Sequence, residues 1–97
     1  MVSILVVDDH SVVREGVVLT LEREEDLSVC GEAEDLVQAR AILTETPPDL
    51  ILLDISLSKD KETGLDFLRE LRQKENRVPV MVLSMYEEPI YVEKALK

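Results

Sequence analysis

The chain of 97 residues is long enough for one domain with a modest core and too short for two. Its formal net charge of −10 offers no basic surface for nucleic acid, so we expect cations or a basic partner surface instead. No apolar run approaches the roughly 18 residues that a membrane span needs, and the first residues lack a secretory signal, which predicts a cytoplasmic protein without membrane contact.

The N-terminal third of the chain predicts a strand, a helix and a second strand. Residues 3–8 are expected to form the first strand, with aliphatic side chains at 4–7, and 27–31 alternate apolar and polar side chains as an edge strand does. The lone cysteine, Cys30, is expected to pack as a small apolar side chain. Between the strands, His10 or Ser11 can cap a helix. Its apolar residues recur at helical spacing, at Val13, Val17, Val18 and Leu21.

The middle of the chain contains the most deeply buried strand that the sequence predicts. A helix begins near Asp35, which forms a capping box with Gln38, and the pair Pro47-Pro48 ends it. Residues 50–53 are four consecutive aliphatic side chains, which is typical of a strand covered on both faces. Asp54 follows directly, where this strand ends.

The last third predicts a helix, a strand and a further helix. Residues 55–63 are mostly polar and indicate a loop, after which Leu65, Leu68 and Leu71 lie along one face of a helix. Residues 78–84 form an apolar strand that ends on Ser84. Pro89 suits the first turn of a fourth helix, and its apolar residues are Ile90, Val92, Ala95 and Leu96.

A strand followed by a helix therefore occurs four times. This alternation predicts a parallel sheet between helix layers, a three-layer α/β domain that occupies residues 1–97. The carboxyl ends of parallel strands meet at one edge of the sheet, where open α/β sheets bind ligands. We therefore expect Asp8, Asp9 and Asp54 to meet there with the hydroxyl of Ser84.

Three ionised carboxylates at one place repel one another, and a bound cation relieves the repulsion. Hard oxygen ligands with room for water suit Mg²⁺. An ionised aspartate is already a usable nucleophile, and phosphoryl transfer requires mainly positioning and charge stabilisation. Asp54 is the best candidate acceptor. Taken singly, each aspartate is more often a turn residue, a helix cap or a solvated charge, and the serine is more often a turn residue. The functional interpretation depends on the occurrence of all four residues at the same edge of the sheet.

The segments 4–10, 48–55 and 79–84 resemble the receiver domain of two-component response regulators. The Asp-Asp-His sequence and the Arg14-Glu15-Gly16 that follows are most similar to receivers of NarL/FixJ-type transcription factors. The resemblance implies a flavodoxin-like fold with strand order 2-1-3-4-5. It implies a regulatory phosphoacceptor and not an enzyme in the ordinary sense. A sensor histidine kinase would be the phosphoryl donor, and the output would be a DNA-binding domain.

The resemblance also assigns roles to individual residues. Asp54 would be the phosphoacceptor, Asp9 and Asp54 would bind Mg²⁺ directly, and Asp8 would act mostly through water. The main-chain carbonyl of Ser56 would complete the protein ligands. Ser84 would be the switch hydroxyl that moves toward the phosphoryl group. The family position two residues beyond that hydroxyl, which tunes dephosphorylation and partner access, is occupied by Tyr86.

The chain departs from the family pattern at two places. Leu57-Ser58 replace the usual Met-Pro pair, and the loop that follows is about two residues longer than usual. The family's fifth strand, its lysine and its fifth helix have no counterpart before Lys97. Without a fifth strand, the strand at 78–84 becomes an exposed edge, which predicts a homodimer or higher oligomer that covers it.

Two other functions remain open. The chain can be a receiver-like interaction or dimerisation module that acts without phosphorylation, in which case Asp54→Asn would leave its partner bound. It can also be a metal-dependent phosphatase with a phospho-aspartyl intermediate. That class commonly places two aspartates one residue apart, whereas Asp8 and Asp9 are adjacent.

Overall fold

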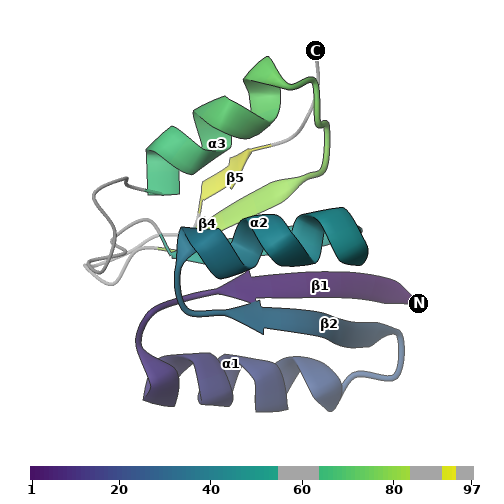
Figure 1. Ribbon diagram of the computed structural model, residues 1–97. Helices are drawn as coiled ribbons and strands as arrows, with labels where there is room; N and C mark the ends of the chain where they lie inside the picture. Colours follow the sequence, from purple (N-terminus) through teal and green to yellow (C-terminus); the bar gives the residue numbers. More distant parts are fainter. Residues whose placement is uncertain (55–63, 84–90, 94–97) are drawn as a thin grey trace.

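The computed structural model of the chain describes residues 1–54, 64–83 and 91–93. Its strands form one sheet in the order β2-β1-β3-β4-β5, and the first four are parallel (Figure 1). The predicted parallel sheet with strand order 2-1-3-4 is thereby confirmed. The elements are β1 (Val2–Val7), α1 (Ser11–Glu22), β2 (Leu27–Ala33), α2 (Leu36–Glu45), β3 (Leu50–Asp54), α3 (Gly64–Gln73), β4 (Val80–Leu83) and β5 (Tyr91–Glu93).

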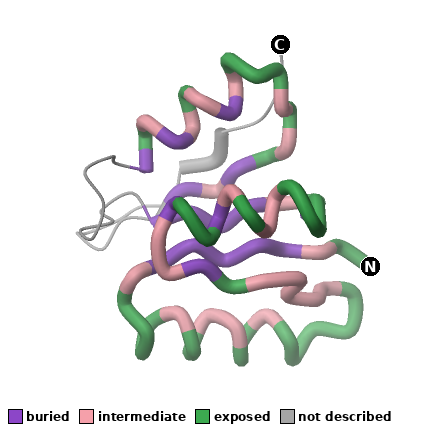
Figure 2. The backbone as a smooth tube through the Cα atoms, in the orientation of Figure 1, coloured by how far each residue is buried: buried purple, intermediate pink, exposed green. Residues whose placement is uncertain are grey.

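Helices cover both faces of the sheet, as the three-layer prediction requires. Successive side chains of a strand point to opposite faces. Leu5 and Val7 of β1 therefore belong to a core shared with α2 and α3, whereas Ile4 and Val6 pack against α1. β1 and β3 lie in the middle of the sheet and are the most deeply buried strands, as Figure 2 shows. These two strands are consequently a rigid base for whatever follows their carboxyl ends.

The predicted helix start at Asp35 is confirmed, with a small difference in the pairing. The Asp35 carboxylate accepts a hydrogen bond from the Gln38 backbone N–H at 2.9 Å. The Gln38 side chain in turn accepts one from the backbone N–H of Glu34, not of Asp35, at 3.0 Å. At α1 the N-cap is His10, whose side chain makes no capping hydrogen bond. The His10 imidazole is therefore available for other contacts.

The edge of the sheet formed by β2 is also as expected. β2 is the edge strand, and all but one of its residues are at least partly exposed. Cys30 on β2 is partly buried against the α2–α3 core, and burial raises the pKa of its thiol. The thiol form is favoured, so Cys30 has the inert packing role that the sequence predicts.

Two expectations for the C-terminal region are wrong. Residues 91–93 lie in a strand, β5, and not in a fourth helix, and β5 pairs antiparallel with β4. β4 is therefore not an edge, and the predicted oligomer through an exposed strand 78–84 loses its basis. Tyr91 and Val92 are compatible with a strand, and the pairing with β4 decides the outcome because it satisfies β4 amides that would otherwise be unpaired. β5 is not the parallel fifth strand of the resemblance.

The buried face of α3 also differs from the prediction. Phe67 is fully buried and Leu71 is 4% exposed, whereas Leu65 is 44% exposed. Leu68 is only partly buried. The contact face is centred on the one phenylalanine of the chain, since a large aromatic ring buries more apolar area than leucine does. Among the described helices, none combines the length and the apolar character that a bilayer crossing requires.

A charged contact joins α2 to α3 beside Phe67. The Arg40 guanidinium donates two hydrogen bonds to the Glu70 carboxylate, from Nε at 3.0 Å and from an Nη at 2.8 Å. The same guanidinium lies 5.8 Å from the centre of the Phe67 ring. The hydrogen bond from Arg40 lowers the pKa of Glu70. Arg40 therefore supports the packing of Phe67 from the solvent side.

Replacing Phe67 by alanine should lower the free energy of unfolding by about 3–5 kcal/mol, because it leaves a cavity between α3 and the sheet. Urea unfolding followed by circular dichroism measures this loss. Leu65→Ala on the same helix is the matched control and should change stability by less than about 0.5 kcal/mol. Equal losses for the two variants would contradict the packing described.

The Arg40–Glu70 pair makes a prediction about pH. A carboxyl whose pKa is lowered by folding stabilises the folded state above its unfolded pKa, and this contribution is lost as the pH falls through the folded pKa. Wild type should exceed Glu70→Gln in stability by roughly 0.5–1 kcal/mol at pH 7, a modest value because both side chains are partly exposed. The difference should vanish well below the ordinary glutamate pKa of 4.5. Urea titrations across this range test it, and a difference that does not depend on pH would contradict it.

Candidate functional site

Three carboxylates meet at the carboxyl ends of the two central strands. Asp8 and Asp9 directly follow β1, and Asp54 is the last residue of β3. The two strands are adjacent and parallel, with Val7 opposite Leu53, so the next residue of each lies at the same edge of the sheet. The side chains of Asp8, Asp9 and Asp54 are only 5%, 3% and 2% exposed. The sequence prediction that these aspartates share one place agrees with the structure.

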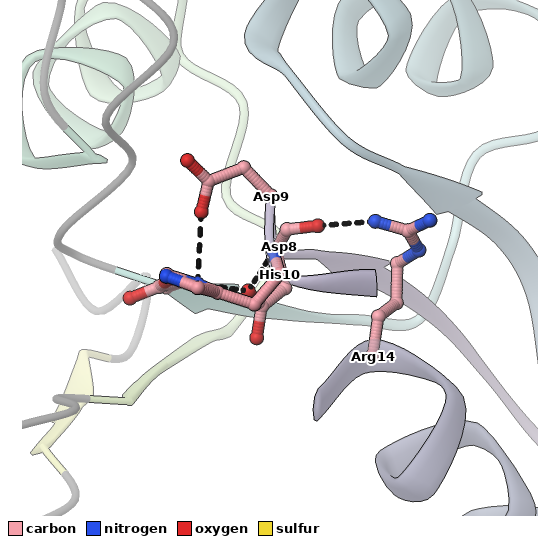
Figure 3. A network of polar contacts seen from close by, with 5 residues as sticks. Asp8, Asp9, His10 and Arg14 are labelled. Carbon is pink, nitrogen blue, oxygen red and sulfur yellow. Dashed lines mark hydrogen bonds and ion pairs between the residues drawn. The ribbon is translucent and has the colours of Figure 1, made fainter. Parts of the chain in front are cut away.

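His10 contacts all three carboxylates with one ring nitrogen. Its Nδ1 lies 3.1 Å from Asp8 Oδ1, 3.0 Å from Asp9 Oδ1 and 3.5 Å from Asp54 Oδ2. In Figure 3 the imidazole lies beside the Asp9 carboxylate, and a dashed line joins the two. One ligand atom from each of these four residues lies within 4.8 Å of the other three. The imidazole is thus the only basic side chain in this four-residue group.

The electrostatics of the group favour a positive charge at its centre. Burial raises the pKa of Asp8, and the nearby Asp54 carboxylate acts in the same direction, while hydrogen bonds from His10 oppose the rise. The hydrogen bond to Asp8 raises the pKa of His10, and the neighbouring carboxylates add to this. Negative charge is therefore costly here unless a cation accompanies it.

Arg14 holds the backbone of the acidic turn. One Nη of its guanidinium donates to the main-chain carbonyl of Asp8 at 2.6 Å (Figure 3). Its Nε donates to Glu32 on β2 at 3.3 Å. The Asp8 backbone N–H donates to the carbonyl of Ala33 at 3.0 Å. The His10 backbone N–H donates to Asp8 Oδ1 at 2.9 Å. These contacts fix the turn between β1 and α1 from both sides, so the carboxylates are held in position.

Part of this site was predicted from the sequence. The prediction placed Asp8, Asp9 and Asp54 together, but it gave His10 only a capping role and gave Arg14 none. The available signal was their spacing: His10 is the residue after the acidic pair, and Arg14 follows one helical turn later, on the same side of α1. Ser56, Ser84 and Tyr86, which the resemblance also singled out, lie outside the described residues.

The donor set fits a divalent cation. The carboxylates are hard oxygen ligands that converge from two strands, and their crowding is relieved by added positive charge. Asp8 Oδ1 is already engaged by the His10 backbone N–H. The three carboxylates and the His10 imidazole could together hold one divalent ion.

Comparison with known proteins identifies the family. A family model described as the response regulator receiver domain matches residues 4–97. DegU, a transcriptional regulatory protein of Brevibacillus brevis, is 35% identical over 96 residues, which are 99% of this chain and 40% of DegU. The nitrate/nitrite response regulator protein NarL of Escherichia coli K12 is 36% identical over 90 residues, which are 91% of this chain and 41% of NarL. The chain spans about two fifths of the length of these relatives.

A solved structure gives the same result. The two-component response regulator of the LuxR family from Aurantimonas sp. SI85-9A1 superposes with a TM-score of 0.80 at 31% identity, over 90% of this chain and 61% of that one. The predicted resemblance to receivers of the NarL/FixJ type is confirmed. The family model covers the chain from β1 onward, and the acidic site lies where β1 and β3 end. The chain belongs to the response regulator receiver domain family.

Proposed function

We propose that this chain is a phosphoacceptor signalling domain that accepts a phosphoryl group on Asp54 from a sensor histidine kinase, with Mg²⁺ bound. The observation that carries the proposal is the convergence of Asp8, Asp9 and Asp54. Their ligand atoms lie within 4.8 Å of one another at the end of two buried strands. Family membership supports it, since receiver domains are regulatory modules.

Each residue of the site has a chemical task in this proposal. A carboxylate oxygen of Asp54 forms a bond to phosphorus while the bond from phosphorus to the nitrogen of the donor histidine breaks, and that nitrogen keeps the electron pair. A carboxylate is a usable nucleophile without a base to activate it, so none is required beside Asp54. Asp9 and Asp54 would hold the cation, and Asp8 would orient the water around it. Mg²⁺, when bound, offsets the negative charge of the phosphoryl oxygens.

The remaining roles rest on family membership. We propose the main-chain carbonyl of Ser56 as a further metal ligand and the Ser84 hydroxyl as the group that moves toward the phosphoryl oxygen. DegU and NarL are a transcriptional regulatory protein and a response regulator. The proposed output is therefore control of transcription by a DNA-binding domain in the whole protein, in the cytoplasm. This segment contributes no nucleic-acid contact of its own.

An interaction module that works without phosphorylation is the main alternative. It would explain the fold equally well, but it gives no reason to bury three carboxylates at one strand edge, which is unfavourable without a counter-charge. A phosphatase with a phospho-aspartyl intermediate is less favoured, because the second aspartate of the pair is adjacent to the first.

Mg²⁺ should stabilise the chain through this site. At a concentration one hundred times its Kd, the ion should add about 2.7 kcal/mol to the free energy of unfolding. Asp54→Asn should lose most of this gain, yet be more stable than wild type by roughly 1 kcal/mol without metal, because one of three crowded carboxylates becomes neutral. Asp26→Asn, at an exposed position, is the control and should keep the full response to Mg²⁺. Thermal unfolding with and without Mg²⁺ measures all three proteins, and an equal response of Asp54→Asn and wild type would argue against the site.

Acetyl phosphate with Mg²⁺ should add one phosphoryl group to Asp54. Intact-mass spectrometry should detect the adduct, and reduction with borohydride followed by peptide mapping should locate it. The adduct should be absent in Asp54→Asn and greatly reduced in Asp9→Asn, since the cation would lose one of two direct carboxylate ligands.

The control for this experiment is Asp49→Asn, at the opposite end of β3. Asp49 accepts hydrogen bonds from Ser3 and lies before the strand begins, so its loss should leave the yield of adduct unchanged. A chain that is folded and binds Mg²⁺ but gives no adduct on Asp54 would contradict the proposed function and favour the interaction module.

A further inference from the structure

The imidazole of His10 lies beside the carboxylates of the proposed metal site. Its Nδ1 is 3.0 Å from Asp9 Oδ1 and 3.5 Å from Asp54 Oδ2. The chain has a single histidine. A nitrogen donor in this place gives the site a mixed set of ligand atoms, and the ion that prefers such a set differs from the ion that prefers oxygen alone.

These separations are those of neighbouring ligands on one metal. An ion with ligands about 2.1 Å away at right angles has adjacent ligand atoms about 3.0 Å apart. The distance from His10 Nδ1 to Asp9 Oδ1, 3.0 Å, matches this value, and the distance to Asp54 Oδ2, 3.5 Å, is longer. Small rotations of the side chains, not a rearrangement of the backbone, would bring all three atoms onto one ion.

The backbone keeps His10 in this position. Its N–H donates to Asp8 Oδ1 at 2.9 Å, and its carbonyl accepts from the backbone N–H of Arg14 at 2.8 Å as the first turn of α1 begins. The Arg14 guanidinium holds the carbonyl of Asp8 at 2.6 Å. The Cα of His10 is thus fixed beside the carboxylates, although the side chain is 43% exposed and accessible to an entering ion.

We propose that His10 Nδ1 is a direct ligand of the ion held by Asp9 and Asp54, so that the site binds a first-row transition ion such as Co²⁺ more tightly than Mg²⁺. The inference rests on the proposed metal site of the phosphoacceptor function. Imidazole is a good ligand for Co²⁺, Ni²⁺ and Zn²⁺ and a poor one for Mg²⁺, which prefers oxygen. Asp8 Oδ1 lies 3.1 Å from His10 Nδ1, but it also accepts the His10 backbone N–H, and we assign Asp8 to the water around the ion as in the proposed function.

The alternative is that an entering ion displaces the imidazole into solvent. His10 would then compete with every divalent ion alike, and its removal would raise the affinities for Mg²⁺ and Co²⁺ together. Direct ligation makes the opposite prediction for Co²⁺. The effects of removing His10 on the affinities for Mg²⁺ and Co²⁺ therefore distinguish a ligand from a competitor.

Calorimetric titration of the untagged chain with Mg²⁺ and with Co²⁺ tests the proposal. Wild type should bind Co²⁺ at least about tenfold more tightly than Mg²⁺. His10→Ala should lower the affinity for Co²⁺ by at least about tenfold. Mutation of a residue that only orients a metal ligand already costs about this much, so the loss of a direct ligand should cost no less. The same variant should keep or raise the affinity for Mg²⁺. Cys30→Ser is the matched control, because it removes the one thiol of the chain, which lies on β2 away from the carboxylates, and it should change neither affinity.

Proton NMR of wild type with Co²⁺ provides a second readout that does not depend on the variant. Since His10 is the sole histidine, strongly hyperfine-shifted imidazole ring signals can come from no other residue. Their presence supports the proposal. Unshifted ring signals at saturating Co²⁺, or a Co²⁺ affinity that His10→Ala leaves unchanged or raises, would overturn it. If wild type binds neither ion, the proposed phosphoacceptor site fails as well; if it binds both and only these His10 tests fail, that site stands.

Discussion

Three carboxylates crowd together at one edge of the sheet, and the surrounding fold holds them there. Asp8, Asp9 and Asp54 are each at most 5% exposed at the side chain, and water cannot screen their repulsion as it would at an open surface. A fold that tolerates this arrangement must hold it from outside. It does so with the two most buried strands, which end side by side and cannot move apart without opening the core.

Two basic side chains, Arg14 and His10, contact the acidic turn in different ways. Arg14 contacts only the main-chain carbonyl of Asp8 and Glu32, so it fixes the backbone without neutralising the site. His10 reaches the carboxylate oxygens themselves and is partly open to solvent. The Arg14 contact holds the backbone, whereas the His10 imidazole lies beside the carboxylate oxygens that an entering cation would contact. This division allows the turn to remain ordered while the charge at its centre changes.

Much of the fold could be predicted from sequence because its signals are local. The aliphatic runs of β1 and β3, the apolar spacing of α1 and the cap at Asp35 each require only a few neighbouring residues. The strand at 91–93 could not be predicted, since eight residues after Pro89 fit a helix as well as a strand and the pairing partner, β4, decides between them. Leu65 and Phe67 likewise differ in burial only through the turn of α3 against the sheet. At the site, strand ends predicted the aspartates, whereas the positions of the His10 and Arg14 side chains depend on three-dimensional contacts.

The central claim is that Asp8, Asp9 and Asp54 respond to one and the same cation. Carbon-13 NMR of the aspartate side-chain carboxyl groups during a Mg²⁺ titration measures this directly, with assignments from single Asp→Asn variants. The signals of these three residues should shift together along one binding curve with a common Kd, while the signal of exposed Asp26 stays in place. Signals of Asp9 and Asp54 that follow different curves, or that do not move, would contradict it.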